Sequence, residues 1–277
     1  MRLVMTLLVR NEEDIVKENI DFHLSQGVDH VIAMNNLSTD CTRDVLLNYS
    51  SQGVLTLIDQ EDDNYAQSEW VTEMALIAHR QLGADWIINN DADEFWFAEN
   101  QNLKSFFDGL PYHVNLVRGQ RNDMVCVEEC HPQKDNQPFY RRMKYRTVYS
   151  ANKLPKRPRA KVAHRSIPGA RVMQGNHNVA GFAKKVFSSK ELEILHYPLR
   201  SSQQFLQKIN LGGKAYRNNK NLPKRIGHTW RNMYKELKKT GKISYLEENI
   251  YTFNQLDKMI EEGKVMLDSR LAIALDS

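Results

Sequence analysis

Strands and helices alternate through the first 91 residues, and this alternation constrains the fold more than any other feature of the sequence. Short apolar runs have the length of buried strands, and the segments between them place apolar residues three or four apart, as one face of a helix does. The pattern predicts strands over residues 3–9, 28–34, 53–58 and 86–90, and helices over residues 12–24, about 40–49 and 67–82. Such an order is typical of a mostly parallel sheet with helices on both faces, so we predict an α/β fold.

Polar residues follow three of these strands at the point where each strand ends. They are Arg10-Asn11-Glu12, Asn35-Asn36 and Asp91-Ala92-Asp93. Because ligands of such sheets bind at the carboxyl ends of the strands, we expect these clusters to meet on one edge. Two aspartates one residue apart suit a hard cation, Mg²⁺ or Mn²⁺, which binds carboxylate and phosphate oxygens together. The sequence therefore predicts a site for a nucleoside diphosphate.

Charge is distributed unevenly along the chain. Residues 59–99 contain eleven acidic residues and one basic residue, whereas residues 136–235 contain twenty-three Lys and Arg and two acidic residues. This separation fits a site with a divalent cation on one wall and a polyanion on the other, and it fits equally well two solvated faces that attract each other. No nucleic-acid-binding motif accompanies the basic half, so we expect no nucleic acid partner.

Three segments resemble the successive motifs of a known enzyme family. They are Leu8-Val9-Arg10-Asn11-Glu12, residues 35–42 and Asp91-Ala92-Asp93-Glu94-Phe95. Together they resemble family 2-like glycosyltransferases with the GT-A fold, and the D-x-D-E-F variant with the later His196-Tyr197 is most similar to the branch related to glycosyltransferase family 92. The resemblance implies a metal-dependent enzyme that moves a sugar from a nucleoside diphosphate sugar, expected to be a UDP-sugar, to a hydroxyl of a saccharide acceptor. By analogy we expect a role in surface polysaccharide biosynthesis.

The resemblance also implies roles for individual residues. The expected nucleotide-sugar ligands are Arg10, Asn11, Glu12, Asn36, Asp59 and Asp91, and the expected ligands of Mn²⁺ or Mg²⁺ are Asp91, Asp93, His177 and His196. Asn36 stands where the family often has an aspartate that reads the base, which leaves the base open. Asp59 is explained equally well as a turn residue, and Glu94 as the partner of a basic side chain. Lys161 could bind the diphosphate, although a solvated surface position is the simpler expectation.

An inverting transfer needs a general base within hydrogen-bond reach of the acceptor hydroxyl, whereas a retaining transfer needs none there. Few acidic residues lie between Glu99 and Lys235. Asp123 and Glu128 flank a predicted strand over residues 124–127, and they are our candidates for the base of an inverting enzyme.

The C-terminal part of the chain has a helical pattern. We predict a GT-A catalytic domain over residues 1–225, with a nucleotide-binding half (1–100) and an acceptor half (101–225), followed by a helical extension over residues 226–277. In this extension Trp230, Met233, Tyr234 and Leu237 fall on one stripe beside several lysines. Such a stripe ordinarily packs on a core, but a basic amphipathic helix can also lie on an anionic membrane, so a peripheral membrane contact is an alternative.

Cysteine usage and hydropathy bear on the location of the protein. The chain has three cysteines, Cys41, Cys126 and Cys130. It lacks the apolar stretch of about 20 residues that crosses a bilayer, so we expect a cytoplasmic protein.

Two other functions fit part of the pattern. A sugar-phosphate nucleotidyltransferase also uses paired aspartates and a divalent ion, but residues 8–12 lack the glycines of its triphosphate loop. A non-enzymatic polyanion-binding protein would use the basic half alone.

Overall fold

The computed structural model describes residues 1–99, 101–127, 137–149 and 158–276. The chain divides into two compact units, each built from segments that are distant in sequence. Unit 1 comprises residues 1–62, 66–121 and 159–195, and unit 2 comprises residues 63–65, 122–158 and 196–277. Glu128, one of the two candidate bases, lies outside the described residues.

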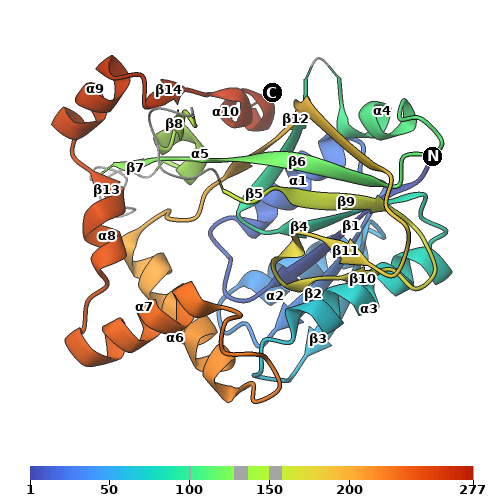
Figure 1. Ribbon diagram of the computed structural model, residues 1–277, viewed down its shortest axis with the longest axis horizontal. Coiled ribbons are helices and arrows are strands. Elements are labelled where there is room, and N and C mark those ends of the chain that lie inside the picture. Colours follow the sequence, from blue (N-terminus) through green and yellow to red (C-terminus); the bar gives the residue numbers. More distant parts are fainter. Residues whose placement is uncertain (100, 128–136, 150–157, 277) are drawn as a thin grey trace. The chain divides into compact units, whose positions relative to one another are not determined.

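Unit 1 is built around an eight-stranded sheet with the order β3-β2-β1-β4-β9-β6-β12-β5 (Figure 1). Its elements in chain order are β1 (Leu3–Val9), α1 (Val16–Ser25), β2 (His30–Asn36), α2 (Thr42–Ser51), β3 (Leu55–Gln60), α3 (Gln67–Arg80), β4 (Trp86–Asp91), β5 (Glu94–Ala98), α4 (Leu103–Asp108), β6 (Leu116–Asp123), β9 (Lys161–Arg165), β10 (Arg171–Val172), the 3₁₀ helix η2 (Gln174–Asn176), β11 (Val179–Ala180) and β12 (Val186–His196). The last residues of β6 (122–123) and of β12 (196) fall in unit 2. All the strands and helices predicted in the first 91 residues are present.

The strands β3, β2, β1 and β4 run parallel, and their register aligns their carboxyl ends. Val9 of β1 lies opposite Asn35 of β2, and Leu8 lies opposite Asp91 of β4. Asn35 in turn lies opposite Asp59 of β3. On the other side β4 and β6 both pair antiparallel with β9, which makes the sheet mixed. The predicted α/β class is therefore confirmed, and the predicted polar clusters share one edge of the sheet.

The parallel strands β1, β2 and β4 are buried along nearly their whole length and therefore on both faces, which explains their apolar runs. Trp70 and Met74 of α3 pack against a face that includes Ile32 and Ile87. On α1, Phe22 packs edge-on against Phe95 of β5, with ring centroids 5.6 Å apart. Burial on two faces selects the continuous apolar runs that made these strands predictable.

Unit 2 combines helices with short strand pairs. Its elements are β7 (Cys126–Val127), α5 (Phe139–Arg142), β8 (Tyr145–Thr147), α6 (Ser202–Asn218), α7 (His228–Thr240), α8 (Ser244–Asn249), β13 (Ile250–Tyr251), α9 (Phe253–Glu261), β14 (Val265–Leu267) and α10 (Arg270–Asp276). β13 pairs parallel with β7, and β14 pairs antiparallel with β8. The C-terminal segment is thus helical as predicted, but two short strands tie it to residues 126–127 and 145–147. The strand predicted over residues 124–127 is shorter than expected, because only Cys126 and Val127 form β7.

Two adjacent glycines on α6 allow aromatic side chains of α7 to pack closely against that helix. A Cβ atom added at Gly212 would lie 2.4 Å from Cζ3 of Trp230, and one added at Gly213 would lie 2.3 Å from Cβ of Tyr234. Trp230 and Tyr234 therefore pack on α6 within unit 2, as the first of the two interpretations predicted. None of the helices among the described residues has the length and apolar character that crossing a membrane requires.

Candidate active site

The loops after β1 and β2 are locked together by hydrogen bonds. The backbone N–H of Asn11 donates to Oγ of Ser38 at 3.0 Å, and Oδ1 of Asn11 accepts from the backbone N–H of Thr39 at 2.8 Å. Asn11 adopts a φ of 53°, which its short polar side chain tolerates. Neither Ser38 nor Thr39 caps the second helix. They bind Asn11 instead, and α2 begins at Thr42 after Cys41.

The backbone of Glu12 forms a further hydrogen bond between the segments that follow β1 and β2. Its backbone N–H donates to Oγ1 of Thr42 at 2.9 Å, and its carbonyl oxygen accepts from the backbone N–H groups of Ile15 and Val16. These bonds form a turn, so the first helix begins at Val16 and not at Glu12 as predicted. Glu12 is 7% exposed and Arg10 is partly buried. The two loops form one preorganised edge at the ends of β1 and β2.

Asn36 and Asp59 are held by their neighbours at the ends of β2 and β3. Nδ2 of Asn36 donates to the carbonyl oxygens of Gln60 and Asp62 at 3.1 and 2.7 Å. Its amide donors therefore shape the loop after β3. Asp59 accepts hydrogen bonds from Arg43 and from Nδ2 of Asn35, and these two bonds lower the pKa of its carboxyl group.

The turn formed by Asp91, Ala92 and Asp93 is fixed from beneath by two buried amides. Nδ2 of Asn19 donates to the carbonyl oxygens of Ala92 and Glu94 at 2.9 and 2.8 Å. Nδ2 of Asn90 donates to Oδ1 of Asn19 at 3.0 Å and to the carbonyl oxygen of Glu94 at 3.2 Å. Both amides are at most 1% exposed. These hydrogen bonds fix the backbone of the turn and thereby the positions of its two aspartates.

A neutral histidine completes this support. Nδ1 of His23 donates to the carbonyl oxygen of Asn19 at 2.7 Å, so Nε2 is left to accept from the backbone N–H of Trp96 at 3.3 Å. Burial lowers the pKa of His23 to about 4. The imidazole therefore stays neutral at physiological pH and serves both bonds as a single tautomer.

Asp91 is bound on both of its oxygens. Its Oδ2 accepts a short hydrogen bond from Nζ of Lys161, and its Oδ1 accepts from Nδ2 of Asn176 at 3.0 Å and from Nε2 of Gln67 at 3.4 Å. Lys161 also lies 3.2 Å from Oε1 of Glu94, and Arg121 lies 3.5 Å from the same oxygen. Glu94 thus pairs with basic side chains, as one of its interpretations held. Lys161 is 2% exposed, so the expected solvated position is wrong.

His177 lies beside this cluster. Its Nδ1 donates to the carbonyl oxygen of Ala160 at 3.0 Å, and burial, reinforced by the nearby Lys161, lowers its pKa to about 4. A Cβ atom added at Gly175 would lie 3.1 Å from Nε2 of His177. The absence of a side chain at Gly175 thus leaves space beside Nε2 of His177. The φ of Gly175 is 80°, a conformation that glycine adopts more easily than other residues.

Asp93 is 6% exposed. Across the described ranges, no three His, Cys, Asp or Glu side chains lie close enough together to hold a metal ion by themselves. His196, the other candidate ligand, belongs to unit 2, where its Nδ1 donates to Oδ1 of Asp123 at 2.6 Å. Oδ2 of Asp123 accepts from the hydroxyl of Tyr149 at 2.9 Å. Asp123 therefore has two hydrogen-bond donors that orient its carboxylate.

Several residues of the site were missed at the level of sequence. Asn19, Gln67 and Asn176 lie in segments with no recognisable motif, and their role is visible only from their bonds to the Asp91–Asp93 turn. Asn90 had a usable signal, because an amide inside an apolar strand needs a buried partner.

The arrangement defines an α/β enzyme with an acidic turn at the carboxyl edge of a mixed sheet. The sequence matches the model of glycosyltransferase family 92 over residues 5–253. The chain therefore belongs to glycosyltransferase family 92. This confirms the predicted glycosyltransferase in preference to the nucleotidyltransferase and the polyanion-binding protein.

Solved structures with distant similarity to the chain are also found. Residues 1–349 of TarS from S. aureus are similar with 11% sequence identity and a TM-score of 0.39, over 87% of this chain and 73% of that chain. The same protein in complex with UDP gives 13% identity and a TM-score of 0.41, over 86% and 71%. Glucosyl-3-phosphoglycerate synthase from Mycobacterium tuberculosis, in complex with Mn²⁺, UDP and phosphoglyceric acid, gives 16% identity and a TM-score of 0.30, over 43% of each chain. No curated protein matches the sequence.

Proposed function

We propose that this glycosyltransferase uses a nucleoside diphosphate sugar, with UDP as the nucleotide, and transfers the sugar with inversion to a hydroxyl of a saccharide acceptor. The observation that carries the proposal is the Asp91–Asp93 turn at the carboxyl end of β4, fixed by Asn19 and Asn90. Enzymes that rely on electrostatic stabilisation of a leaving group need charged groups held in place before the reaction.

A divalent cation is part of the proposal, because the donor set suits one. Asp91 and Asp93 offer carboxylate oxygens and His177 offers a neutral imidazole, a combination that favours Mn²⁺ over Mg²⁺. The bond from Nδ1 of His177 to the carbonyl of Ala160 is the outer-shell contact that metal-ligating histidines usually make, and it directs Nε2 away from that carbonyl. Since no three such side chains among the described residues lie close enough together to hold the ion by themselves, these residues would bind it together with phosphate oxygens of the nucleotide, and the bound ion would neutralise charge on the departing diphosphate.

The nucleotide is expected to occupy the edge formed by the loops after β1, β2 and β3. Arg10, Asn11 and Glu12 belong to the first of these loops, and Asn36 and Asp59 end the next two strands. The side-chain N–H groups of Asn36 donate to backbone carbonyl oxygens. We therefore expect its side-chain oxygen, or the surrounding backbone, to contact the base.

Asp123 is the proposed general base in unit 2. A carboxylate can act as a base only if it is oriented toward the hydroxyl that it deprotonates. His196 and Tyr149 supply that orientation through bonds of 2.6 and 2.9 Å. We therefore propose that His196 positions Asp123, a role that differs from the metal ligand expected from the sequence.

The setting of the enzyme is also part of the proposal. Cys41 and Cys126 are both free thiols, as is usual in a reducing compartment, and we propose a cytoplasmic enzyme of surface polysaccharide biosynthesis. We do not propose a membrane contact through α7, because Trp230 and Tyr234 pack against α6.

Release of UDP from UDP-glucose and UDP-galactose in the presence of Mn²⁺ tests this function. We expect slow release by the purified chain without an acceptor, lost on addition of a chelator and in Asp93→Asn. The matched control is Asp257→Asn, an exposed aspartate on α9, which should retain the activity. Release that is unchanged in Asp93→Asn would contradict the proposal.

A further inference from the structure

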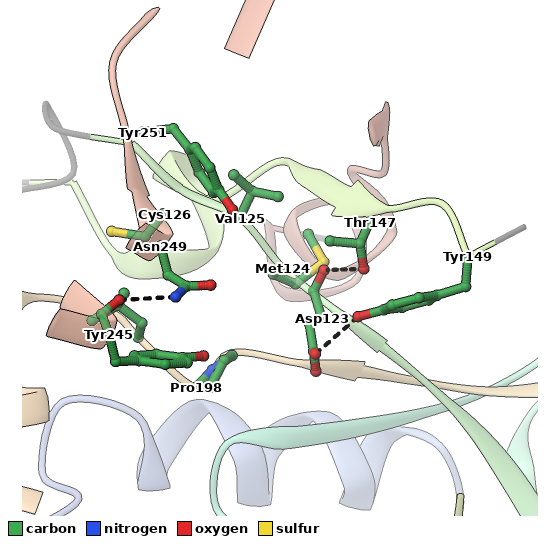
Figure 2. A pocket seen from close by; sticks show the side chains of 11 residues that line it. Asp123, Met124, Val125, Cys126, Thr147, Tyr149, Pro198, Tyr245, Asn249 and Tyr251 are labelled. Carbon is green, nitrogen blue, oxygen red and sulfur yellow. Dashed lines mark hydrogen bonds between the residues drawn. The ribbon is translucent and has the colours of Figure 1, made fainter. Parts of the chain in front are cut away.

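Unit 2 contains a pocket that is lined in part by Asp123. Its volume is about 200 Å³. That is below the roughly 300–1,000 Å³ of sites for drug-sized ligands, so it suits one small ring. Figure 2 shows Asp123, Thr147 and Tyr149 on one side and Tyr245, Asn249 and Tyr251 on the other.

The second wall comes from the C-terminal segment. β13 carries Tyr251 and pairs with β7, where Tyr251 lies opposite Val127. Tyr245 of α8 stacks on Phe205 of α6, with ring centroids 5.1 Å apart and an interplanar angle of 13°. Nδ2 of Asn249 donates to the carbonyl oxygen of Tyr245 at 2.9 Å. These contacts make the wall a fixed part of unit 2.

The lining offers both hydroxyl-binding groups and apolar surface. The side chain of Asp123 is 28% exposed, and the oxygens of a carboxylate can accept further hydrogen bonds beyond those from His196 and Tyr149. Met124, Val125, Pro198 and Leu199 add apolar surface. A ring with hydroxyls on its edge and C–H groups on its face matches such a lining.

The charge of the residues that line the pocket restricts which class of sugar can bind there. The chain is rich in Lys and Arg over residues 136–235, yet the described residues that line the pocket include neither. Asp123 is the charged side chain among them. A phosphorylated or carboxylated sugar would bring a second negative charge next to the carboxylate of Asp123, and like charges repel each other in a partly buried site.

We infer that this pocket binds one uncharged sugar ring of the acceptor, and that the C-terminal segment from Tyr245 to Tyr251 forms part of the acceptor site. The inference rests on the proposed function, since it assigns the pocket to the acceptor of that transfer. It excludes sugar phosphates and uronic acids as the residue bound at Asp123.

Saturation-transfer NMR on the full chain tests the inference without any turnover. The probes are the methyl glycosides of glucose, galactose and mannose, compared with glucose 6-phosphate, galactose 6-phosphate and glucuronic acid. We expect at least one neutral glycoside to receive saturation and the three anionic sugars to receive none. Tyr251→Ala should weaken that binding about fivefold, as loss of an aromatic contact does. Tyr112→Ala is the matched control, because Tyr112 is 93% exposed and lies in unit 1.

A second variant keeps the test decisive if Tyr251→Ala does not fold. Asn249→Lys places a cation in the wall, and it should admit a sugar 6-phosphate that the wild type does not bind. Binding of anionic sugars by the wild type, absence of binding by every neutral glycoside, or equal binding by Tyr251→Ala and Tyr112→Ala would each overturn the inference. UDP with Mn²⁺ is measured in parallel. Binding of UDP without any neutral glycoside defeats the acceptor pocket alone, whereas the reverse result defeats the proposed donor and leaves the pocket.

Discussion

Lys161 of β9 donates to Oδ2 of Asp91 from a fully buried position and so places a cation next to the acidic turn. Burial alone would lower the pKa of Lys161, but the carboxylates of Asp91 and Glu94 outweigh it and raise the pKa. The ammonium is therefore charged at neutral pH.

Removing the buried ammonium should destabilise unit 1. Lys161→Met leaves the carboxylates of Asp91 and Glu94 close together without their cation, and breaking a buried pair in this way costs about 3–5 kcal/mol. Urea unfolding followed by tryptophan fluorescence measures the loss. Lys190→Met, at an exposed position of β12, should change stability by less than about 0.5 kcal/mol. Adding Glu94→Gln to Lys161→Met should restore part of the loss, and no restoration would contradict the pairing.

The buried histidines make stability depend on pH. Burial is the main cause that lowers the pKa of His23, His164 and His177 to about 4. Below pH 6.5 the unfolded chain takes up protons that the native state does not, so the free energy of unfolding falls as the pH falls toward 4. Each histidine contributes up to about 1.4 kcal/mol per pH unit.

Two histidine variants check this pH dependence. His23→Gln should reduce the slope of the free energy of unfolding between pH 6.5 and 5 by about one proton. The exposed His113→Gln should leave the slope unchanged. The account fails if stability is flat across this range in the wild type.

The packing of α7 on α6 predicts a strong coupling between Gly212 and Trp230. Gly212→Ala inserts a methyl group where the indole lies, and overpacking of this kind costs about 1–3 kcal/mol. Trp230→Leu makes room for the methyl group, so the double variant should be more stable than the sum of the single effects predicts. Gly109→Ala is the control, because its Cβ would meet no atom closer than 3.4 Å. If the stability change of the double variant, measured by thermal unfolding, equals the sum of the two single changes, the contact between Gly212 and Trp230 is refuted.

Asp123 should matter for transfer and not for donor binding. Asp123→Asn keeps the shape of the side chain but removes the base, and we expect transfer of labelled sugar to a neutral methyl glycoside to fall about 10²–10⁴-fold. Binding of UDP with Mn²⁺, measured by calorimetry, should stay within about twofold of the wild type. Transfer that survives in Asp123→Asn within about threefold would exclude this aspartate as the base.

The fold was predictable where local pattern and tertiary structure agree. Strands such as β1 and β4 are buried on both faces and therefore appear as continuous apolar runs. The start of α1 was not predictable, because the hydroxyl of Thr42, thirty residues away, takes the backbone N–H of Glu12.

The site was less predictable than the fold, for a similar reason. Lys161 looks like a solvated lysine in a basic segment, and only the β4–β9 pairing brings it to Asp91 and Glu94. The wall of the unit 2 pocket depends on two residues of β13 that pair with β7 across more than a hundred positions of sequence. Such short strands carry no periodicity of their own.

Thermal unfolding with UDP, in the presence and absence of Mn²⁺, tests the central claim most directly. A ligand at a hundred times its Kd stabilises the native state by about 2.7 kcal/mol, so we predict a rise in Tm of about 5 °C or more with UDP and Mn²⁺ together. Neither UDP nor Mn²⁺ alone should match it. Asp93→Ala should abolish the rise, and the exposed Asp257→Ala should keep it. A shift that needs no metal, or that persists in Asp93→Ala, would contradict a cation-dependent nucleotide site at the Asp91–Asp93 turn.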